Sequence, residues 1–139
     1  MKYSTILFLS LVLSSCSLHR DGVRFIKSAS KPNSYEVKID ERIYGEIDRK
    51  REWGGLTGHL NTTKKWLVIE DGTGGDSYPR LLVYRLDEGK MMPSKDMSDI
   101  KGSISDKPAE AIVDPIFLGF DSSGFPLIFA SNTTLTIKN

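Results

Sequence analysis

The stretch EDGTGGDSYPR, from Glu70 to Arg80, combines three glycines with acidic and hydroxyl side chains, a composition found in cation- and phosphate-binding loops. A phosphate-binding P-loop is excluded, because it needs Gly-Lys-Ser/Thr before a helix, whereas a proline and a strand-like segment follow Ser77 here. As a calcium loop, the stretch offers Asp71, Thr73 and Asp76 but lacks the later bidentate glutamate of an EF-hand. We interpret it as a hairpin loop whose glycines supply positive φ, with weak cation binding as the alternative.

The chain contains two histidines, His19 and His59. A Ser-His-Asp arrangement could be assembled from Ser77, His59 and either Asp71 or Asp76, but no G-x-S-x-G elbow accompanies these residues. A two-histidine metal site is disfavoured because His19 lies close to the N-terminal segment described below. We therefore expect His59 to be a partly buried, hydrogen-bonded histidine just before a strand. A small hydrolase that uses His59 is the alternative.

Aromatic residues in loops are candidates for protein–protein contacts, because such residues are enriched at binding surfaces. Trp53 lies in REWGG, between a charged run and a glycine pair, and Tyr78 lies in the Gly-rich stretch. The candidate partner contacts are Trp53, Asp71, Asp76 and Tyr78, together with the weakly patterned segment from Met91 to Lys107.

The N-terminus has the layout of a secretory signal. Lys2 gives a positive start, an apolar run from Ile6 to Leu13 follows, and small residues lead to Cys16. The residues Leu13-Ser14-Ser15-Cys16 resemble the lipobox of bacterial lipoproteins. The resemblance implies that the Cys16 sulfur receives a diacylglyceryl group, that residues 1–15 are removed, and that the new amino group is often acylated. Several acyl chains are needed because each buried CH₂ contributes only ~0.8 kcal/mol.

The resemblance also implies an address in the cell envelope. In Gram-negative lipoproteins an aspartate after the cysteine tends to retain the protein in the inner membrane, and Ser17 stands there instead. We therefore expect a lipid anchor at the periplasmic face of the outer membrane, if the host has one. The expected organisation is a signal peptide at 1–15, a lipidated tether at 16–22 and one β domain at 23–139.

The charge balance excludes some partners. The chain has 19 basic and 18 acidic residues, and removal of Lys2 with the signal leaves 18 of each, with no basic block. This balance argues against nucleic acid and against electrostatic membrane binding. Cys16 is the only cysteine, so the domain has no disulfide and no cysteine metal site. We expect no cofactor and no metal.

The patterning of the mature chain is that of β-strands separated by turns. SYEVKID alternates strictly, with Tyr35, Val37 and Ile39 on one face. KKWLVIE and RLLVYRL are continuous apolar runs that suit strands covered on both faces. The expected fold is mainly β, a single small antiparallel meander that is sandwich- or barrel-like, after an N-terminal signal helix.

Two segments repeat each other. In GHLNTTKKWLVIEDG and LGFDSSGFPLIFAS, an apolar residue, an Asx residue and a polar turn precede an apolar strand, with Asn61 matching Asp121. The stretches 59–90 and 118–131 resemble the blade repeats of TolB-associated β-propellers. The resemblance implies strand-turn-strand geometry only, because the mature chain is too short for a closed propeller of about four or more blades.

The function that these features favour is a non-enzymatic, membrane-anchored envelope lipoprotein. The expected partners are the lipid bilayer, through acylated Cys16, and another envelope protein or cell-wall material. An inhibitor or immunity protein against an envelope-acting toxin or enzyme is an alternative within the same class.

Overall fold

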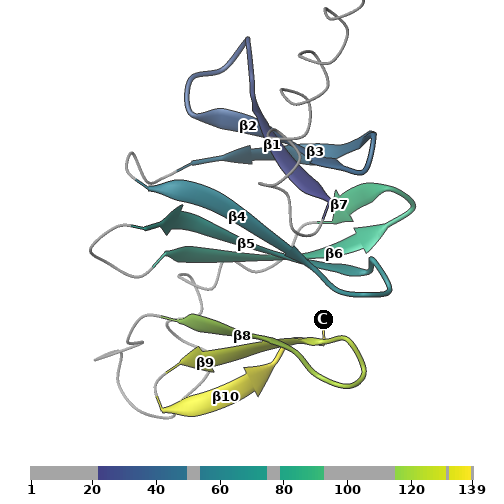
Figure 1. Ribbon diagram of the computed structural model, residues 1–139, viewed down its shortest axis with the longest axis vertical. Helices are drawn as coiled ribbons and strands as arrows, with labels where there is room; N and C mark the ends of the chain where they lie inside the picture. The colour runs from purple at the N-terminus through teal and green to yellow at the C-terminus, as the bar shows by residue number, and fades with distance from the viewer. Residues whose placement is uncertain (1–21, 50–53, 75–78, 93–114, 131, 139) are drawn as a thin grey trace, which may run out of the picture.

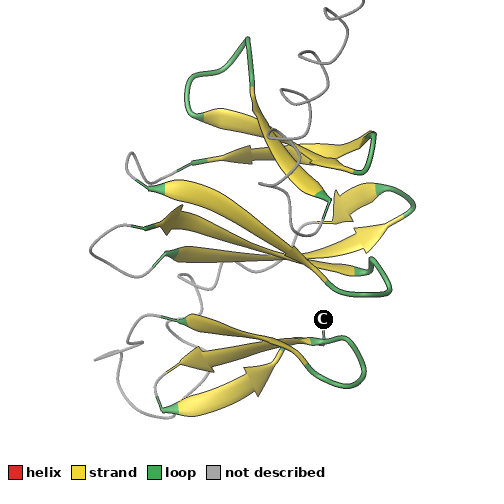
Figure 2. Ribbon diagram, in the orientation of Figure 1, coloured by secondary structure: helices red, strands yellow, loops and turns green. Residues whose placement is uncertain are grey.

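The computed structural model describes residues 22–49, 54–74, 79–92, 115–130 and 132–138, and in these residues the chain forms ten strands in three antiparallel sheets (Figures 1 and 2). Sheet A contains β1 (Val23–Lys27), β2 (Ser34–Ile39) and β3 (Arg42–Asp48). Sheet B contains β4 (Gly55–Leu60), β5 (Trp66–Thr73), β6 (Arg80–Asp87) and β7 (Lys90–Met92). Sheet C contains β8 (Ile116–Phe120), β9 (Pro126–Ala130) and β10 (Thr133–Thr136).

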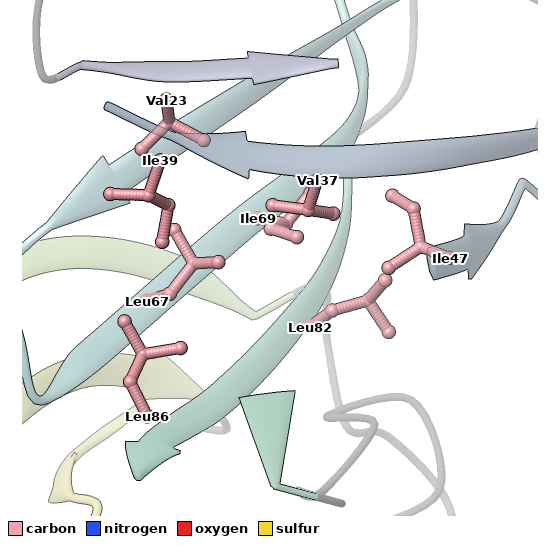
Figure 3. Close-up of a cluster of buried hydrophobic side chains, with 8 residues drawn as sticks. All are labelled: Val23, Val37, Ile39, Ile47, Leu67, Ile69, Leu82 and Leu86. Carbon is pink, nitrogen blue, oxygen red and sulfur yellow. The ribbon is translucent and has the colours of Figure 1, made fainter. Parts of the chain in front are cut away.

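The three sheets are stacked with sheet B in the middle (Figure 1). Sheets A and B enclose one hydrophobic core, drawn in Figure 3, formed by Val23, Val37, Ile39, Ile47, Leu67, Ile69, Leu82 and Leu86. Sheets B and C enclose a second core, formed by Trp66, Val68, Leu81, Val83, Ile128 and Ile137. Each sheet is a meander, because its strands are neighbours in the order in which they occur in the chain.

The continuous apolar runs of β5 and β6 are explained by this position. Leu67 and Ile69 belong to the core with sheet A, whereas Val68, between them, belongs to the core with sheet C. Since successive side chains of a strand point to opposite faces, a strand between two cores needs apolar residues at every position. The prediction that these two strands are covered on both faces is confirmed.

The predicted fold class is confirmed, with three layers in the sandwich. The alternation in SYEVKID is confirmed as well, since Val37 and Ile39 are buried in the core between sheets A and B and Tyr35 packs against it. The expected signal helix, Cys16 and nearly all of the tether lie outside the described residues.

The internal repeat corresponds to two similar turns, in each of which the backbone N–H of the residue three positions after the Asx residue, Lys64 or Gly124, donates a hydrogen bond of 2.9 Å to the carbonyl of the Asx residue. The Oδ1 of Asn61, at the end of β4, accepts hydrogen bonds from the backbone N–H of Lys65 and Trp66 at 2.9 and 3.0 Å. The Oδ1 of Asp121, which follows β8, accepts from the backbone N–H of Ser123 and Phe125, both at 2.9 Å, so the two turns share the bond from the residue four positions later and differ in the other. Asx side chains stabilise turns in this way, by bonding the backbone a few residues later.

Strand β4 is one element that the patterning did not identify, because His59 was expected to precede a strand and instead lies within β4. The strand contains Gly55 and Gly58, residues that are rare inside strands. Gly58 is required by packing, since a Cβ at this position would lie 2.6 Å from Cγ1 of Val23 in sheet A. The close approach of β1 to β4 therefore explains the weak strand signal.

Candidate functional site

His59 forms a pair with a carboxylate that the sequence analysis did not connect to it. Its Nε2 lies 2.7 Å from Oε2 of Glu70 on the adjacent strand β5, and the two side chains are 29% and 21% exposed. The ring also packs against Phe117 of sheet C, with ring centroids 4.8 Å apart. The expectation of a partly buried, hydrogen-bonded histidine is confirmed.

The register of β4 and β5 explains this pairing. His59 is opposite Val68, and Glu70 is two positions further along β5, so the histidine and the carboxylate lie on the same face of sheet B. A contact between diagonal neighbours of a ladder is readable only once the register is known, which is why sequence spacing did not indicate it.

The structure contradicts the hypothetical Ser-His-Asp arrangement in which Asp71 would be the partner of His59. Asp71 is adjacent to Glu70 and therefore points to the opposite face of β5, where its carboxylate binds Arg49 instead of His59. Ser77 and Asp76 lie outside the described residues. The Glu70 carboxylate could orient the His59 imidazole for proton transfer. A hydrogen bond at one ring nitrogen fixes the tautomer of the ring and therefore decides whether the other nitrogen carries a proton.

The placement of Asp71 as an exposed loop contact is also wrong. Asp71 lies within β5 and its side chain is only 1% exposed. Arg49 donates from Nε to Oδ1 at 2.8 Å, and Nη1 of Arg80 lies 4.0 Å from Oδ2. A carboxylate can be buried when it is paired and hydrogen-bonded, and the two arginines meet this condition. A weak cation site would thus lack this ligand.

Arg49 connects the Arg49–Asp71–Arg80 cluster to two other parts of the molecule. The guanidinium lies 5.9 Å from the centroid of the Tyr35 ring, and its Nη2 donates to the backbone carbonyl of Gly54 at 2.9 Å. Asp71 and Arg80 are themselves opposite each other in the β5–β6 ladder. One buried carboxylate therefore ties the end of sheet A to sheet B.

The described ends of two loop segments meet at this cluster. Residues 50–53 are bounded by Arg49 and Gly54, and residues 75–78 lie between β5 and β6, just past Asp71 and before Arg80. Gly54 is packed so closely on β5 that a Cβ would lie 2.7 Å from the carbonyl carbon of Gly72. The remaining contact candidates, Trp53, Asp76 and Tyr78, belong to these two segments and lie outside the described residues, as does 93–107.

The turn between β2 and β3 carries a group of exposed ion pairs. Lys38 approaches Glu41 at 3.1 Å and Arg24 approaches it at 2.6 Å. The hydrogen bond and positive charge of Lys38, and then the charge of Arg24, lower the pKa of the Glu41 carboxyl below its ordinary value. Asp40 of the same turn accepts a hydrogen bond of 2.6 Å from Lys64, in the turn between β4 and β5, and this bond raises the pKa of Lys64.

Within the described ranges, no group of three or more His, Cys, Asp or Glu side chains is arranged to hold a metal ion. The same ranges contain no helix that is long and apolar enough to cross a bilayer. No protein-family model, curated protein or solved structure matches the chain.

Proposed function

We propose that this protein is a bacterial envelope lipoprotein, anchored through acylated Cys16, that acts as a non-enzymatic interaction module. The lipobox-like residues Leu13 to Cys16 support the anchor. The placement that follows is the periplasmic face of the outer membrane, in a host that has one. A short tether after Cys16 keeps the β domain within about 20 Å of the bilayer, at roughly 3.3–3.6 Å per residue.

One structural observation carries the interaction function: the Arg49–Asp71–Arg80 cluster joins the bases of two loop segments that are far apart in sequence. Arg49 Nη2 donates to Gly54 O across the ends of 50–53, and Asp71 pairs with Arg80 across the ends of the β5–β6 connection. Loops held on a rigid sheet scaffold are a common location for binding residues. We therefore propose that the two segments bounded by this cluster, which contain Trp53 and Tyr78, supply the contact surface for another envelope protein or cell-wall material.

The anchor is tested by metabolic labelling with radioactive palmitate. We expect label in the wild-type protein and none in Cys16→Ala, and label that persists in Cys16→Ala would contradict the anchor. A second readout is the electrophoretic shift of the unprocessed Cys16→Ala precursor.

The contact surface is tested by chemical crosslinking in intact cells, followed by affinity capture and mass spectrometry. Trp53→Ala with Tyr78→Ala should abolish a crosslink that survives in Ile26→Ser, a control at an exposed apolar residue of sheet A. Equal loss in both variants would reject the assigned surface. If the captured protein is a toxin or an envelope enzyme, the interaction module acts as an inhibitor or immunity protein.

The second candidate function is a small envelope hydrolase, and the His59–Glu70 contact of 2.7 Å is the observation in its favour. His59→Ala that removes the cellular phenotype, with unchanged thermal stability and unchanged crosslinking, would favour the hydrolase. The interaction module instead requires that His59→Ala retain the phenotype whenever the domain remains folded.

A further inference from the structure

Among the described strands, β10 is an edge of sheet C. In sheet B the third strand, β6, pairs with a fourth strand, β7, whereas β10 is the third and last strand of sheet C among the described residues (Figure 1). The hairpins β4–β5 and β8–β9 correspond to each other, because in each turn a backbone N–H donates a hydrogen bond of 2.9 Å to the carbonyl of the Asx residue three positions earlier. The position that β7 occupies beside β6 therefore has no described strand beside β10.

The backbone groups at this edge follow from one hydrogen bond. The N–H of Ile137 donates to the carbonyl of Pro126 at 2.9 Å, so Ile137 directs its backbone groups toward β9. Because the direction alternates along a strand, Leu135 and Thr133 also face β9, whereas Thr134 and Thr136 direct their N–H and C=O groups to the open edge. Two residues thus offer four main-chain groups to an incoming strand.

With four residues β10 is short, but it lacks charged side chains, proline and bulges, which are the other features that usually prevent strand addition. Strand β1 contains Arg24 and Lys27, β7 has only three residues, and β3, β4 and β8 have register shifts at their pairings. Strand β10 reads Thr-Thr-Leu-Thr and pairs with β9 without a register shift.

The outer face of sheet C is uncharged as well. Ile116 and Leu118 are 38% and 53% exposed. Phe129 is opposite both Ile116 and Thr134 and therefore shares this face, and Leu127 lies two positions from Phe129. The described strands place no charged side chain on this face, whereas the outer face of sheet A carries the pairs of Arg24 and Lys38 with Glu41.

We propose that β10 pairs antiparallel with β10 of a second copy of this chain, across a twofold axis at Leu135. A twofold contact places each surface against itself, so it suits an edge that is neutral and carries no like charges to repel. In this register Leu135 is opposite Leu135 of the partner subunit, and Thr134 is opposite Thr136 of the partner subunit. Two three-stranded sheets become one six-stranded sheet. The inference does not depend on lipid attachment.

The partner is tested with two charge variants of the full chain in detergent, both in a Cys16→Ser background. Thr134→Lys with Thr136→Lys places lysine opposite lysine, whereas Thr134→Lys with Thr136→Glu places lysine opposite glutamate at both positions. Thr134 and Thr136 are exposed, so both variants should fold alike. By analytical ultracentrifugation, we expect concentration-dependent dimers for the Cys16→Ser parent and the Lys/Glu variant, and monomers for the Lys/Lys variant.

A parent that is monomeric at every concentration, or a Lys/Lys variant that dimerises like the parent, would overturn the proposal. The first outcome would be expected if another segment of the chain covers β10. The register is tested by oxidation of Leu135→Cys, since non-hydrogen-bonded partners lie about 4.5 Å apart, within the disulfide range. Thr133→Cys is the control, because its two copies would lie four positions out of register. A disulfide at position 133 but not at 135 would reject the register.

Discussion

The side-chain Nδ2 of Asn61 donates a hydrogen bond of 2.9 Å to the backbone carbonyl of Gly124, which lies 63 positions later in the chain. The two residues belong to the matching turns of the internal repeat, so the repeat joins its own copies across the interface between sheets B and C. Gly124 has a φ of +84°, and a Cβ there would lie 2.8 Å from the Asn61 Nδ2. Only glycine allows the two turns to approach so closely.

Asn61 should therefore be more sensitive to substitution than Asp121, although both cap their turns. Asn61→Asp keeps the oxygen that accepts from Lys65 and Trp66 but loses the donor to Gly124, and we expect it to cost about 1–3 kcal/mol of unfolding free energy. The reciprocal change, Asp121→Asn, keeps its acceptor oxygen and should cost less than about 0.5 kcal/mol. Urea unfolding followed by tryptophan fluorescence measures both values, and equal costs would contradict a structural role for the contact between the turns.

The strands were predictable where burial dictates the pattern. Strand β2 alternates because only one of its faces is buried, whereas β5 and β6 are continuously apolar because both of their faces are buried. Strand β4 was not predictable, because it contains two glycines, and one of them, Gly58, is required by the close packing of Val23 from another sheet. Glu70 and Arg49 were missed for a related reason, since their partners, His59 and Asp71, are set by ladder register and sheet stacking rather than by spacing along the chain.

Asp71 illustrates how a local composition can mislead. The stretch around it is rich in glycine and polar residues, which predicts a loop, yet the strand continues to Thr73 with Gly72 at a φ of +99°. The pairing of Gly55 with Thr73 and of Leu56 with Asp71 leaves Gly72 as the extra residue of a bulge. Asp71 lies before the bulge, on the same face as Leu67 and Ile69, so its carboxylate points toward sheet A and pairs with Arg49 and Arg80.

Removal of the Asp71 carboxylate should leave two arginine side chains that are each 12% exposed without their shared partner. We expect Asp71→Ala to lower the free energy of unfolding by about 3–5 kcal/mol, because removal of one partner of a buried ion pair leaves the other charge buried without compensation. Asp87→Ala, at an exposed aspartate that ends β6, is the control and should change it by less than about 0.5 kcal/mol. Chemical denaturation measures both, and a similar small effect for the two would show that the cluster does not hold the sheets together.

The acid dependence of stability should include a contribution from Glu41. Its pKa is lowered in the folded state by Lys38 and Arg24 from an ordinary value of 4.5, so the folded protein binds its proton less readily than the unfolded chain. The contribution is therefore fully present above pH 4.5 and is lost as the pH falls through the folded-state pKa. The difference in melting temperature between wild type and Glu41→Gln should shrink from pH 6 to pH 3. A difference independent of pH, or one that grows in acid, would contradict the assignment.

The distance between sheets A and B should depend on the absence of a side chain at position 58. A methyl group added there would meet Cγ1 of Val23 at 2.6 Å and the Phe25 ring at 3.3 Å, and both belong to packed side chains of β1 that have little room to shift. We expect Gly58→Ala to cost about 1–3 kcal/mol, the usual range for overpacking a core. Gly45→Ala is the matched control, because the atoms nearest to its methyl group would be those of the flexible Met91 side chain, at 3.4 Å, an ordinary contact. Since alanine also restricts the unfolded chain, Gly45→Ala should be neutral or slightly stabilising in the same thermal melts. If both variants melted at the wild-type temperature, β1 would not be packed on β4 as closely as the structure places it.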